Sequence, residues 1–213
     1  MRLIGLCTLI LGLNLNSCNQ TNQKGTLTEK QDVNQLTSQN LKEKEEIQNL
    51  IKQVLNWADS KNSIDLLPIL TDSNDIIYIG FNLEKHKQNL NKLKATDFFS
   101  SEFIDNYDQI ILTLDKGLKS GEYEQWLVGD LPPFIFANDV NPWCMCQDNA
   151  SGETGVIEVI KIESKSGELL WNWGTNSDWI NYKIRVIKEN EKWKIAYMQG
   201  FDFKESTRKD GQI

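Results

Sequence analysis

Two kinds of hydrophobic pattern follow one another along the chain. Between about residues 43 and 116, apolar positions recur every three to four residues, which predicts amphipathic helices. After Gly121, apolar residues alternate with polar ones, which predicts strands. Helices followed by strands are typical of an α+β fold, so we expect N-terminal helices packed on a mainly antiparallel sheet in a single domain.

Two helices have a clear apolar face. The first opens near Glu43, and the second runs from about Ser101 to Lys116, with Gly117 as the predicted stop. Their inward residues are Ile47, Leu50, Ile51, Val54 and Leu55 in the first, and Phe103, Ile104, Tyr107, Ile110, Ile111 and Leu114 in the second.

Three weaker elements are expected between these helices. Residues 60–70 predict a short helical turn that ends at Pro68, because proline cannot continue a helix. Residues 76–81 form an extended apolar run, and residues 84–94 predict a polar helix.

Two hairpins are expected in the strand region. Residues 155–162 and 169–173 flank one turn, and residues 180–186 and 193–197 flank another. Six of the seven tryptophans lie from Trp126 onward, so we expect an aromatic core. The polar residues 204–213 are expected to form a frayed tail.

The first residues have a targeting pattern. Arg2 precedes an apolar run from Leu3 to Leu13, which is too short to span a bilayer and predicts a signal peptide over residues 1–17. The junction Leu15-Asn16-Ser17-Cys18 resembles a bacterial lipobox. This resemblance implies that Cys18 is acylated, for example with palmitate, and anchors the protein on the membrane of a bacterial cell envelope. Asn19, where aspartate would mark inner-membrane retention, favours the outer membrane with the protein facing the periplasm.

The segment after the junction differs from the rest in composition. Residues 18–42 are rich in Asn, Gln, Thr and Lys and contain few large apolar side chains. Such a segment cannot bury enough surface to offset the entropy of ordering, so we expect a flexible tether before a domain at residues 43–203. The whole chain of 213 residues has a formal charge of −7, which disfavours nucleic acid as a partner.

The order of elements and the last hairpin resemble the nuclear transport factor two-like superfamily. The best match is Tyr182-Lys-Ile-Arg-Val-Ile-Lys-Glu-Asn-Glu-Lys-Trp-Lys-Ile-Ala-Tyr197. The loop Asp139-Val-Asn-Pro-Trp143, followed by Gln147-Asp148, is similar to bacterial lipoproteins of that fold. The resemblance implies a cone-like domain in which a curved sheet wraps around helices and leaves a pocket. Because the superfamily includes enzymes, transport adaptors and secreted binding proteins, it does not select a function.

The proline-bounded loop from Pro132 to Asp148 holds the candidate ligand-binding residues Trp143, Asp148 and Asp139. A carboxylate beside aromatic side chains in an apolar pocket can act as an acid or a base. Loop aspartates also serve simply as turn-formers that bond their own backbone, and this alternative stays open.

Cysteine chemistry is the other candidate. Cys144 and Cys146 remain once Cys7 leaves with the signal peptide and Cys18 is lipidated, and they form a possible redox pair. Zinc needs about four ligands, and the single histidine, His86, lies in a distant predicted helix, so we expect no metal site. His86 itself is expected to be a solvated helix residue, and no cofactor motif is present.

Together these features favour a noncatalytic, membrane-anchored binding or inhibitor module, for a protein or small-molecule ligand. Immunity to a delivered toxin belongs to this class, because an acidic surface can steer a basic effector. The alternative is a pocket hydrolase, isomerase or dehydratase that uses Asp148 or Asp139.

Overall fold

The computed structural model describes residues 24–147, 155–173 and 181–211. The chain divides into two compact units, residues 1–39 and residues 40–213. The elements are α1 (Lys24–Ala58), β1 (Ile69–Thr71), β2 (Tyr78–Phe81), α2 (Leu83–Thr96), α3 (Ser101–Ser120), β3 (Gly155–Ile162), β4 (Ser166–Trp173), β5 (Tyr182–Glu189), β6 (Lys192–Met198), the 3₁₀ helix η1 (Gln199–Phe201) and α4 (Phe203–Ser206). The predicted α+β class, with helices and an antiparallel sheet, is confirmed.

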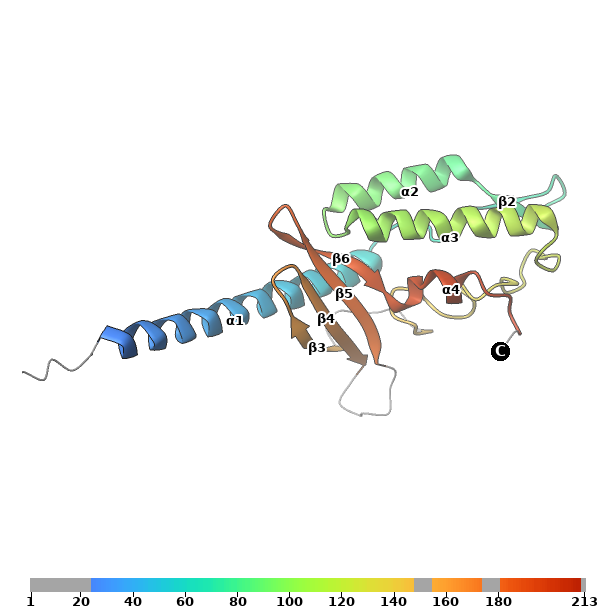
Figure 1. Cartoon of the computed structure of the whole chain (residues 1–213). Coiled ribbons are helices and arrows are strands. Elements are labelled where there is room, and N and C mark those ends of the chain that lie inside the picture. Colours follow the sequence, from blue (N-terminus) through green and yellow to red (C-terminus); the bar gives the residue numbers. More distant parts are fainter. Residues whose placement is uncertain (1–23, 148–154, 174–180, 212–213) are drawn as a thin grey trace, which may run out of the picture. The chain divides into compact units, whose positions relative to one another are not determined.

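The main sheet has four strands in the order β3-β4-β5-β6, each antiparallel to its neighbour (Figure 1). Both predicted hairpins are therefore confirmed. The alternating apolar residues face one side of the sheet and are buried there: Leu169, Trp171, Tyr182, Ile184 and Val186. A separate two-stranded sheet pairs β1 with β2.

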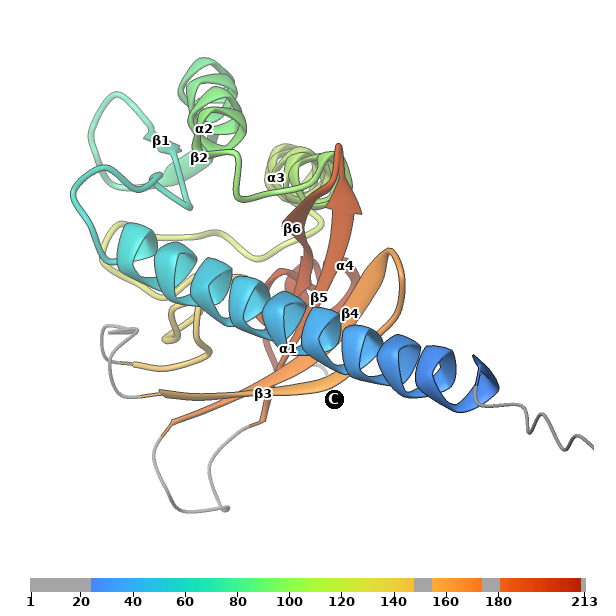
Figure 2. The ribbon, with the colours of Figure 1, turned by 90° about the vertical axis from the view of Figure 1, so that its left-hand side faces the viewer.

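The C-terminal half of α1 packs on the buried face of the main sheet, as Figures 1 and 2 show. The Gln48 Nε2 atom donates a 2.9 Å hydrogen bond to the Ile157 carbonyl of β3. The Lys188 Nζ atom of β5 lies 2.7 Å from the Glu43 Oε1 atom. The predicted apolar face of this helix is buried, from Ile47 to Leu55.

The predicted flexible tether is wrong for residues 24–42, because α1 begins at Lys24. The segment is poor in apolar side chains, but it has no proline, and Lys, Gln, Glu and Leu all favour a helix. Low hydrophobicity indicates little packing, whereas helix formation also depends on backbone propensity.

Helices α2 and α3 run side by side in both ribbon views (Figures 1 and 2). Each begins at a side-chain cap: Asn82 accepts from the Lys85 amide, and Ser100 accepts from the Phe103 amide. The predicted polar helix over residues 84–94 and the helix from Ser101 are confirmed.

Two predicted boundaries in this region are wrong. Gly117 does not end α3; a Cβ atom there would lie 2.2 Å from the Tyr123 ring, so this glycine allows close packing. The helix ends at Gly121, whose φ of +71° suits glycine. Residues 60–70 form turns that lead into β1 rather than a helical turn.

An aromatic cluster joins the helices to the loop before the sheet. Phe99 and Phe103 stack with ring centroids 4.7 Å apart, and Trp143 lies 4.6 Å from Phe201. Trp57 of α1 packs on the edge of this cluster, 5.7 Å from both Phe99 and Trp143. The expected aromatic core is confirmed, but most of the buried aromatic side chains among the described residues come from helices and loops and not from the strands.

The predicted frayed tail is wrong for residues 204–210. The amides of Ile135 and Phe136 donate to the carbonyls of Arg208 and Ser206, and the Asp210 amide donates to the Pro133 carbonyl. Composition alone misses this because the tail is held through its backbone.

Candidate functional site

An acidic groove of about 570 Å³ is the first candidate site. It is lined by Glu122, Glu124, Gln125, Trp126, Asp130, Leu131, Pro132, Pro133, Lys209, Asp210 and Gly211. Of these described residues, four are acidic and one, Lys209, is basic. The groove therefore presents a negative potential over an aromatic and proline-rich floor.

The groove is built by the segment that follows α3. The Tyr78 amide donates to the Trp126 carbonyl and the Val128 amide to the Ile76 carbonyl, so this segment runs beside β2. The Trp126 ring packs at a tilt against Tyr78 with centroids 4.3 Å apart, and its Nε1 atom donates to the Asp130 carbonyl at 3.0 Å. These contacts fix Trp126 in the floor of the groove, and Glu122 and Glu124 of the same segment form one wall.

The C-terminal segment supplies the other wall. The Tyr123 hydroxyl donates a 2.7 Å hydrogen bond to the Thr207 carbonyl. Burial raises the pKa of Tyr123 to about 12, so the hydroxyl stays protonated and keeps this bond across neutral pH. Lys209 and Asp210 are thereby held opposite Glu122 and Glu124.

Exposed apolar side chains adjoin the acidic residues. Ile76 is 56% exposed and Leu131 58% exposed, and Leu127 and Val128 are exposed between them along the chain. Acidic and apolar groups side by side match a partner that carries both basic and apolar side chains.

The loop from Asp139 to Gln147 holds most of the predicted site residues. The Tyr182 hydroxyl donates to the Pro142 carbonyl at 2.7 Å and accepts from the Gly200 amide at 3.1 Å. Trp143 is 2% exposed and belongs to the aromatic cluster. The loop is thus fixed from inside by the sheet and the core.

The predicted ligand-binding residues do not come together as one site. Trp143 is buried in the core, which favours its structural role over contact with a ligand. Asp139 is exposed and accepts a 3.1 Å hydrogen bond from the Gln147 side chain, so its carboxylate does not lie in the apolar pocket that acid or base chemistry would need. Asp148 lies outside the described residues.

Cys144 and Cys146 are joined as a disulfide. Cys144 is 1% exposed, whereas Cys146 is half-buried. The predicted pairing is therefore formed, and its two sulfurs lie in different environments.

His86 is not the solvated residue that the sequence predicts. It is 2% exposed, and its Nε2 atom lies 2.8 Å from the Asp108 Oδ1 atom of α3. Its Nδ1 atom is buried without a hydrogen-bond partner among the described residues. Helix α2 buries one face, formed by His86, Asn89 and Leu93. The polar composition of the helix gives no sign of this face, so the sequence did not predict that His86 is buried.

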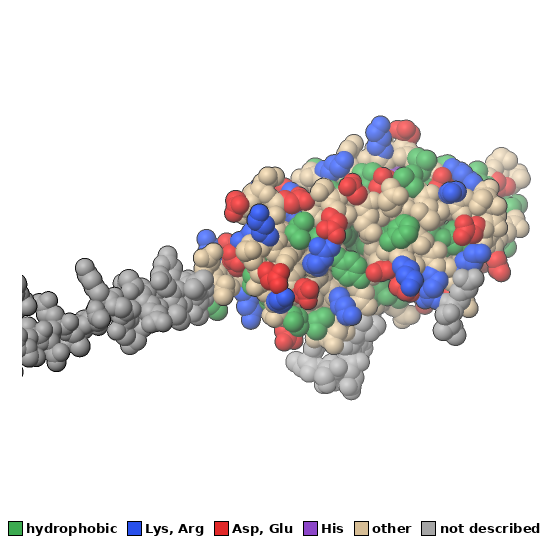
Figure 3. Space-filling model, viewed as in Figure 1, with side chains coloured by type: hydrophobic (Ala, Val, Ile, Leu, Met, Phe, Trp, Pro, Cys, Tyr) green, Lys and Arg blue, Asp and Glu red, His purple; other side chains and the backbone are tan. Residues whose placement is uncertain are grey.

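A second, more apolar groove of about 530 Å³ lies on the main sheet. It is lined by Ile160, Glu168, Leu169, Leu170, Lys183, Ile184, Arg185 and Tyr197. Arg185 is already ion-paired with Glu102 of α3. The view in Figure 3 shows hydrophobic side chains scattered among charges of both signs, so this face has no charge preference that would select a partner.

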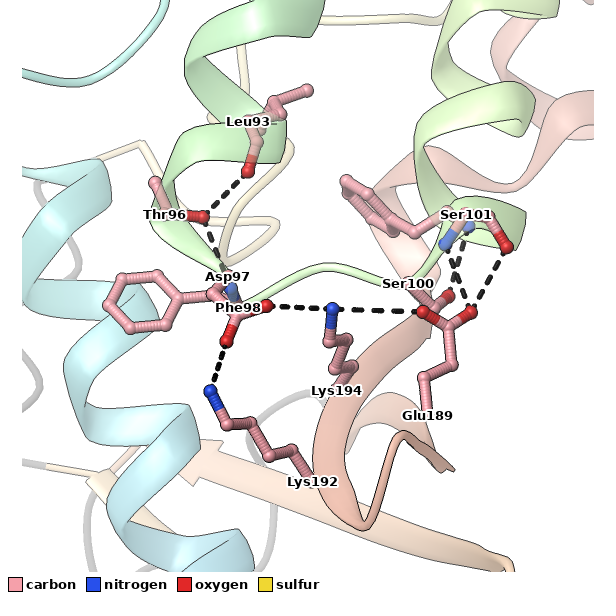
Figure 4. Close-up of polar contacts among 10 residues, drawn as sticks. Leu93, Thr96, Asp97, Phe98, Ser100, Ser101, Glu189, Lys192 and Lys194 are labelled. Carbon is pink, nitrogen blue, oxygen red and sulfur yellow. Dashed lines mark hydrogen bonds and ion pairs between the residues drawn. The ribbon is translucent and has the colours of Figure 1, made fainter.

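An ion-pair network ties the α2–α3 connection to the β5–β6 hairpin (Figure 4). The Asp97 carboxylate lies 2.7 Å from Lys192 Nζ and 2.8 Å from Lys194 Nζ. Hydrogen bonds from Lys192 and then Lys194 lower the pKa of Asp97 to about 2. The network is structural, since each of these charges already has an opposite charge beside it.

Within the described ranges, no three His, Cys, Asp or Glu side chains gather in a way that would hold a metal ion. The helices of the described part include none with the length and apolar character needed to cross a bilayer.

Sequence reasoning missed the acidic groove. Its local signal was present, because Glu122 and Glu124 flank Tyr123 just after the end of a helix. The other wall, with Lys209 and Asp210, comes from a segment more than 80 residues later and has no sequence signal of its own.

Comparison with protein-family models, with curated proteins and with solved structures finds no match to this chain.

Proposed function

We propose that the protein is an envelope lipoprotein whose domain acts as a noncatalytic binding or inhibitor module, and that the acidic groove holds a basic partner. The observation that carries the proposal is the groove, in which Glu122, Glu124, Asp130 and Asp210 surround a floor made by Trp126 and two prolines.

The kind of partner follows from the lining. Four carboxylates attract lysine and arginine side chains, and they also raise the rate of encounter with a positively charged protein. The exposed Leu131 and the neighbouring Leu127 offer apolar area, which a free metal ion or a small polar solute would leave uncovered. A basic protein segment with apolar side chains therefore suits the groove better than either, and a basic toxin neutralised by immunity is one such partner.

The anchor and the fold belong to the same proposal. The apolar run Leu3–Leu13 and the Leu15–Cys18 junction support lipidation at Cys18 and a place at the outer membrane, facing the periplasm. The four-stranded antiparallel sheet crossed by α1 supports a cone-like, nuclear transport factor two-like domain.

Two variants with the same change in net charge test the groove. The first carries Glu122→Gln, Glu124→Gln and Asp130→Asn; the second carries Glu45→Gln, Asp59→Asn and Asp105→Asn, three acidic residues that are exposed and lie outside the groove. Binding of a fluorescein-labelled peptide rich in arginine and leucine is measured by anisotropy at two salt concentrations.

We expect the groove variant to lose at least about tenfold more affinity than its charge-matched control, since each close charge pair contributes about 1 kcal/mol or more. Equal losses in both variants would mean that the peptide responds only to overall charge, and the groove would then not be the site. Capture from an envelope extract by the wild type but not by the groove variant would identify the natural partner.

A further inference from the structure

We propose that the Cys144–Cys146 disulfide is a thiol–disulfide exchange centre, which accepts two electrons from a dithiol at a place separate from the acidic groove. The inference rests on three features of the loop: its support, the unequal burial of the two cysteines, and the short ring that the bond closes.

The loop holds its shape through contacts other than the disulfide. The Asn141 amide donates to the Cys146 carbonyl at 2.8 Å, and the Met145 amide donates to the Asn141 carbonyl at 2.7 Å. The Trp143 amide donates to the Asn141 side chain at 3.0 Å. With Trp143 buried and the Pro142 carbonyl bound by Tyr182, these contacts would persist after reduction. The protein can therefore be reduced and oxidised without refolding.

The bond itself adds little to the stability of the fold. A disulfide stabilises chiefly by restricting the unfolded chain, and this effect shrinks with the length of the closed loop. Here one residue, Met145, separates the two cysteines. Met145 also has a φ of +52°, in the left-handed region that non-glycine residues disfavour. A bond that scarcely stabilises the fold and closes over a disfavoured backbone conformation is better explained by reactivity than by structure.

Unequal burial assigns different roles to the two sulfurs. Cys146 is half-buried beside the exposed Gln147, whereas Cys144 is 1% exposed, so we expect an incoming thiolate to attack Cys146. An accessible cysteine that forms the mixed disulfide and a buried one that leaves as the thiolate are the arrangement that this direction of exchange needs.

The exchange proceeds in two balanced steps. A thiolate of the dithiol attacks the Cys146 sulfur, a mixed disulfide forms, and Cys144 leaves as a thiolate that takes up a proton. The second thiol of the dithiol then loses its proton and attacks the first sulfur of the same dithiol, which is bonded to Cys146. Cys146 leaves as a thiolate and is protonated in turn. The dithiol is oxidised to a disulfide, and the protein gains two electrons and two protons.

The reduction equilibrium is the first test. The full chain with Cys7→Ser and Cys18→Ser, in which Cys144 and Cys146 are the remaining cysteines, is equilibrated in glutathione buffers of increasing reduced fraction. Free thiols are then alkylated and counted by mass spectrometry. We expect half-reduction in a buffer that leaves structural disulfides oxidised, with a melting temperature within a few degrees of the oxidised form. A bond that stays oxidised throughout, or a protein that unfolds on reduction, would overturn the proposal.

The roles of the two sulfurs are tested separately. Adding Cys144→Ser leaves Cys146 as the single thiol, and adding Cys146→Ser leaves Cys144. We expect oxidised glutathione to modify Cys146 at least about tenfold faster than Cys144, with circular dichroism showing both variants folded. Equal rates, or faster reaction at Cys144, would contradict the assigned order of attack. If a serine variant unfolds, the reduction equilibrium of the parent chain still decides whether the centre exists.

Discussion

At the scale of single residues, Asp97 combines two structural roles. It ends α2 in the left-handed conformation, with φ of +60°, and its amide donates to the Lys94 carbonyl. Its carboxylate also binds Lys192 and Lys194 of β6. One side chain thus joins the end of a helix to the edge strand of the sheet.

This pairing makes part of the stability depend on pH. The pKa of Asp97 is lowered from 3.8 to about 2, so the folded state favours the ionised form. The contribution is present in full above about pH 4 and is lost as the pH falls toward 2. We expect the melting temperature of the wild type to exceed that of Asp97→Asn above pH 4, with the difference closing between pH 4 and 2.

Thermal melts from pH 2 to pH 6 check this expectation, with Asp59→Asn as the exposed control. A difference between wild type and Asp97→Asn that stays constant over this range would show that the ion pairs do not matter. Because the Asp97 side chain is half exposed, added salt should also reduce the difference.

Gly200 is required by a close backbone approach. A Cβ atom there would lie 2.0 Å from the Pro142 carbonyl oxygen, which is backbone and cannot turn aside. We expect Gly200→Ala to lower the free energy of unfolding by about 1–3 kcal/mol, measured by urea denaturation. Lys204→Ala, at an exposed position nearby, should change it by less than about 0.5 kcal/mol. An unchanged urea midpoint for Gly200→Ala would mean that the loop can move away.

Residue types predicted burial better than they predicted roles. The apolar faces of α1 and α3 are buried as their spacing predicts. Trp143 lies in a loop that the sequence marks as a candidate site, but its side chain is buried in the core. His86 is buried although its neighbours along the chain are polar. Neither could be placed from the sequence, because both depend on which helix face or loop packs opposite.

At the scale of elements, the β5–β6 hairpin carries an avoidable strain. Its two-residue turn, Asn190 and Glu191, has φ of +52° and +62°, and positive φ at both positions is the pattern of the type I′ turn, which matches the twist of paired strands. Asparagine adopts this conformation more readily than glutamate, and the left-handed region costs a residue such as glutamate about 1–2 kcal/mol.

We therefore expect Glu191→Gly to stabilise the protein by about 0.5–1 kcal/mol, since the relief exceeds the entropy that glycine loses on folding. Glu191→Ala is the matched control, because it removes the same carboxylate but keeps the strain. Urea denaturation distinguishes them. A gain of equal size in both variants would assign the effect to the charge instead of the backbone.

Elements with strong periodicity could be predicted, and the remaining ones could not. The hairpins and the helices that start at Leu83 and Ser101 followed from alternation, spacing and caps. The helical start at Lys24, the end at Gly121 and the docked residues 203–210 did not, because they depend on backbone propensity, on a Tyr123 contact and on distant hydrogen bonds.

At the scale of the whole molecule, the acidic groove and the proposed anchor lie in different parts of the chain. If Cys18 is the lipidated residue, labelled palmitate should mark the wild type, and Cys18→Ala should abolish the labelling. Cys7→Ala, which changes a cysteine of the predicted signal peptide, should keep it. Label that persists in Cys18→Ala would mean that the lipid is attached to another residue.

The docked C-terminal segment also has a consequence for the order of folding. Tyr123 binds a carbonyl 84 residues further along the chain, and residues 133–136 bind those near 206–210. During synthesis, the helices can pair before these partners leave the ribosome, so the Tyr123 hydroxyl and the amides of Ile135 and Phe136 gain their hydrogen-bond acceptors only at a late stage. Protease cleavage after Asp202 would therefore remove the acceptors of these three hydrogen bonds and leave the groove without Lys209 and Asp210.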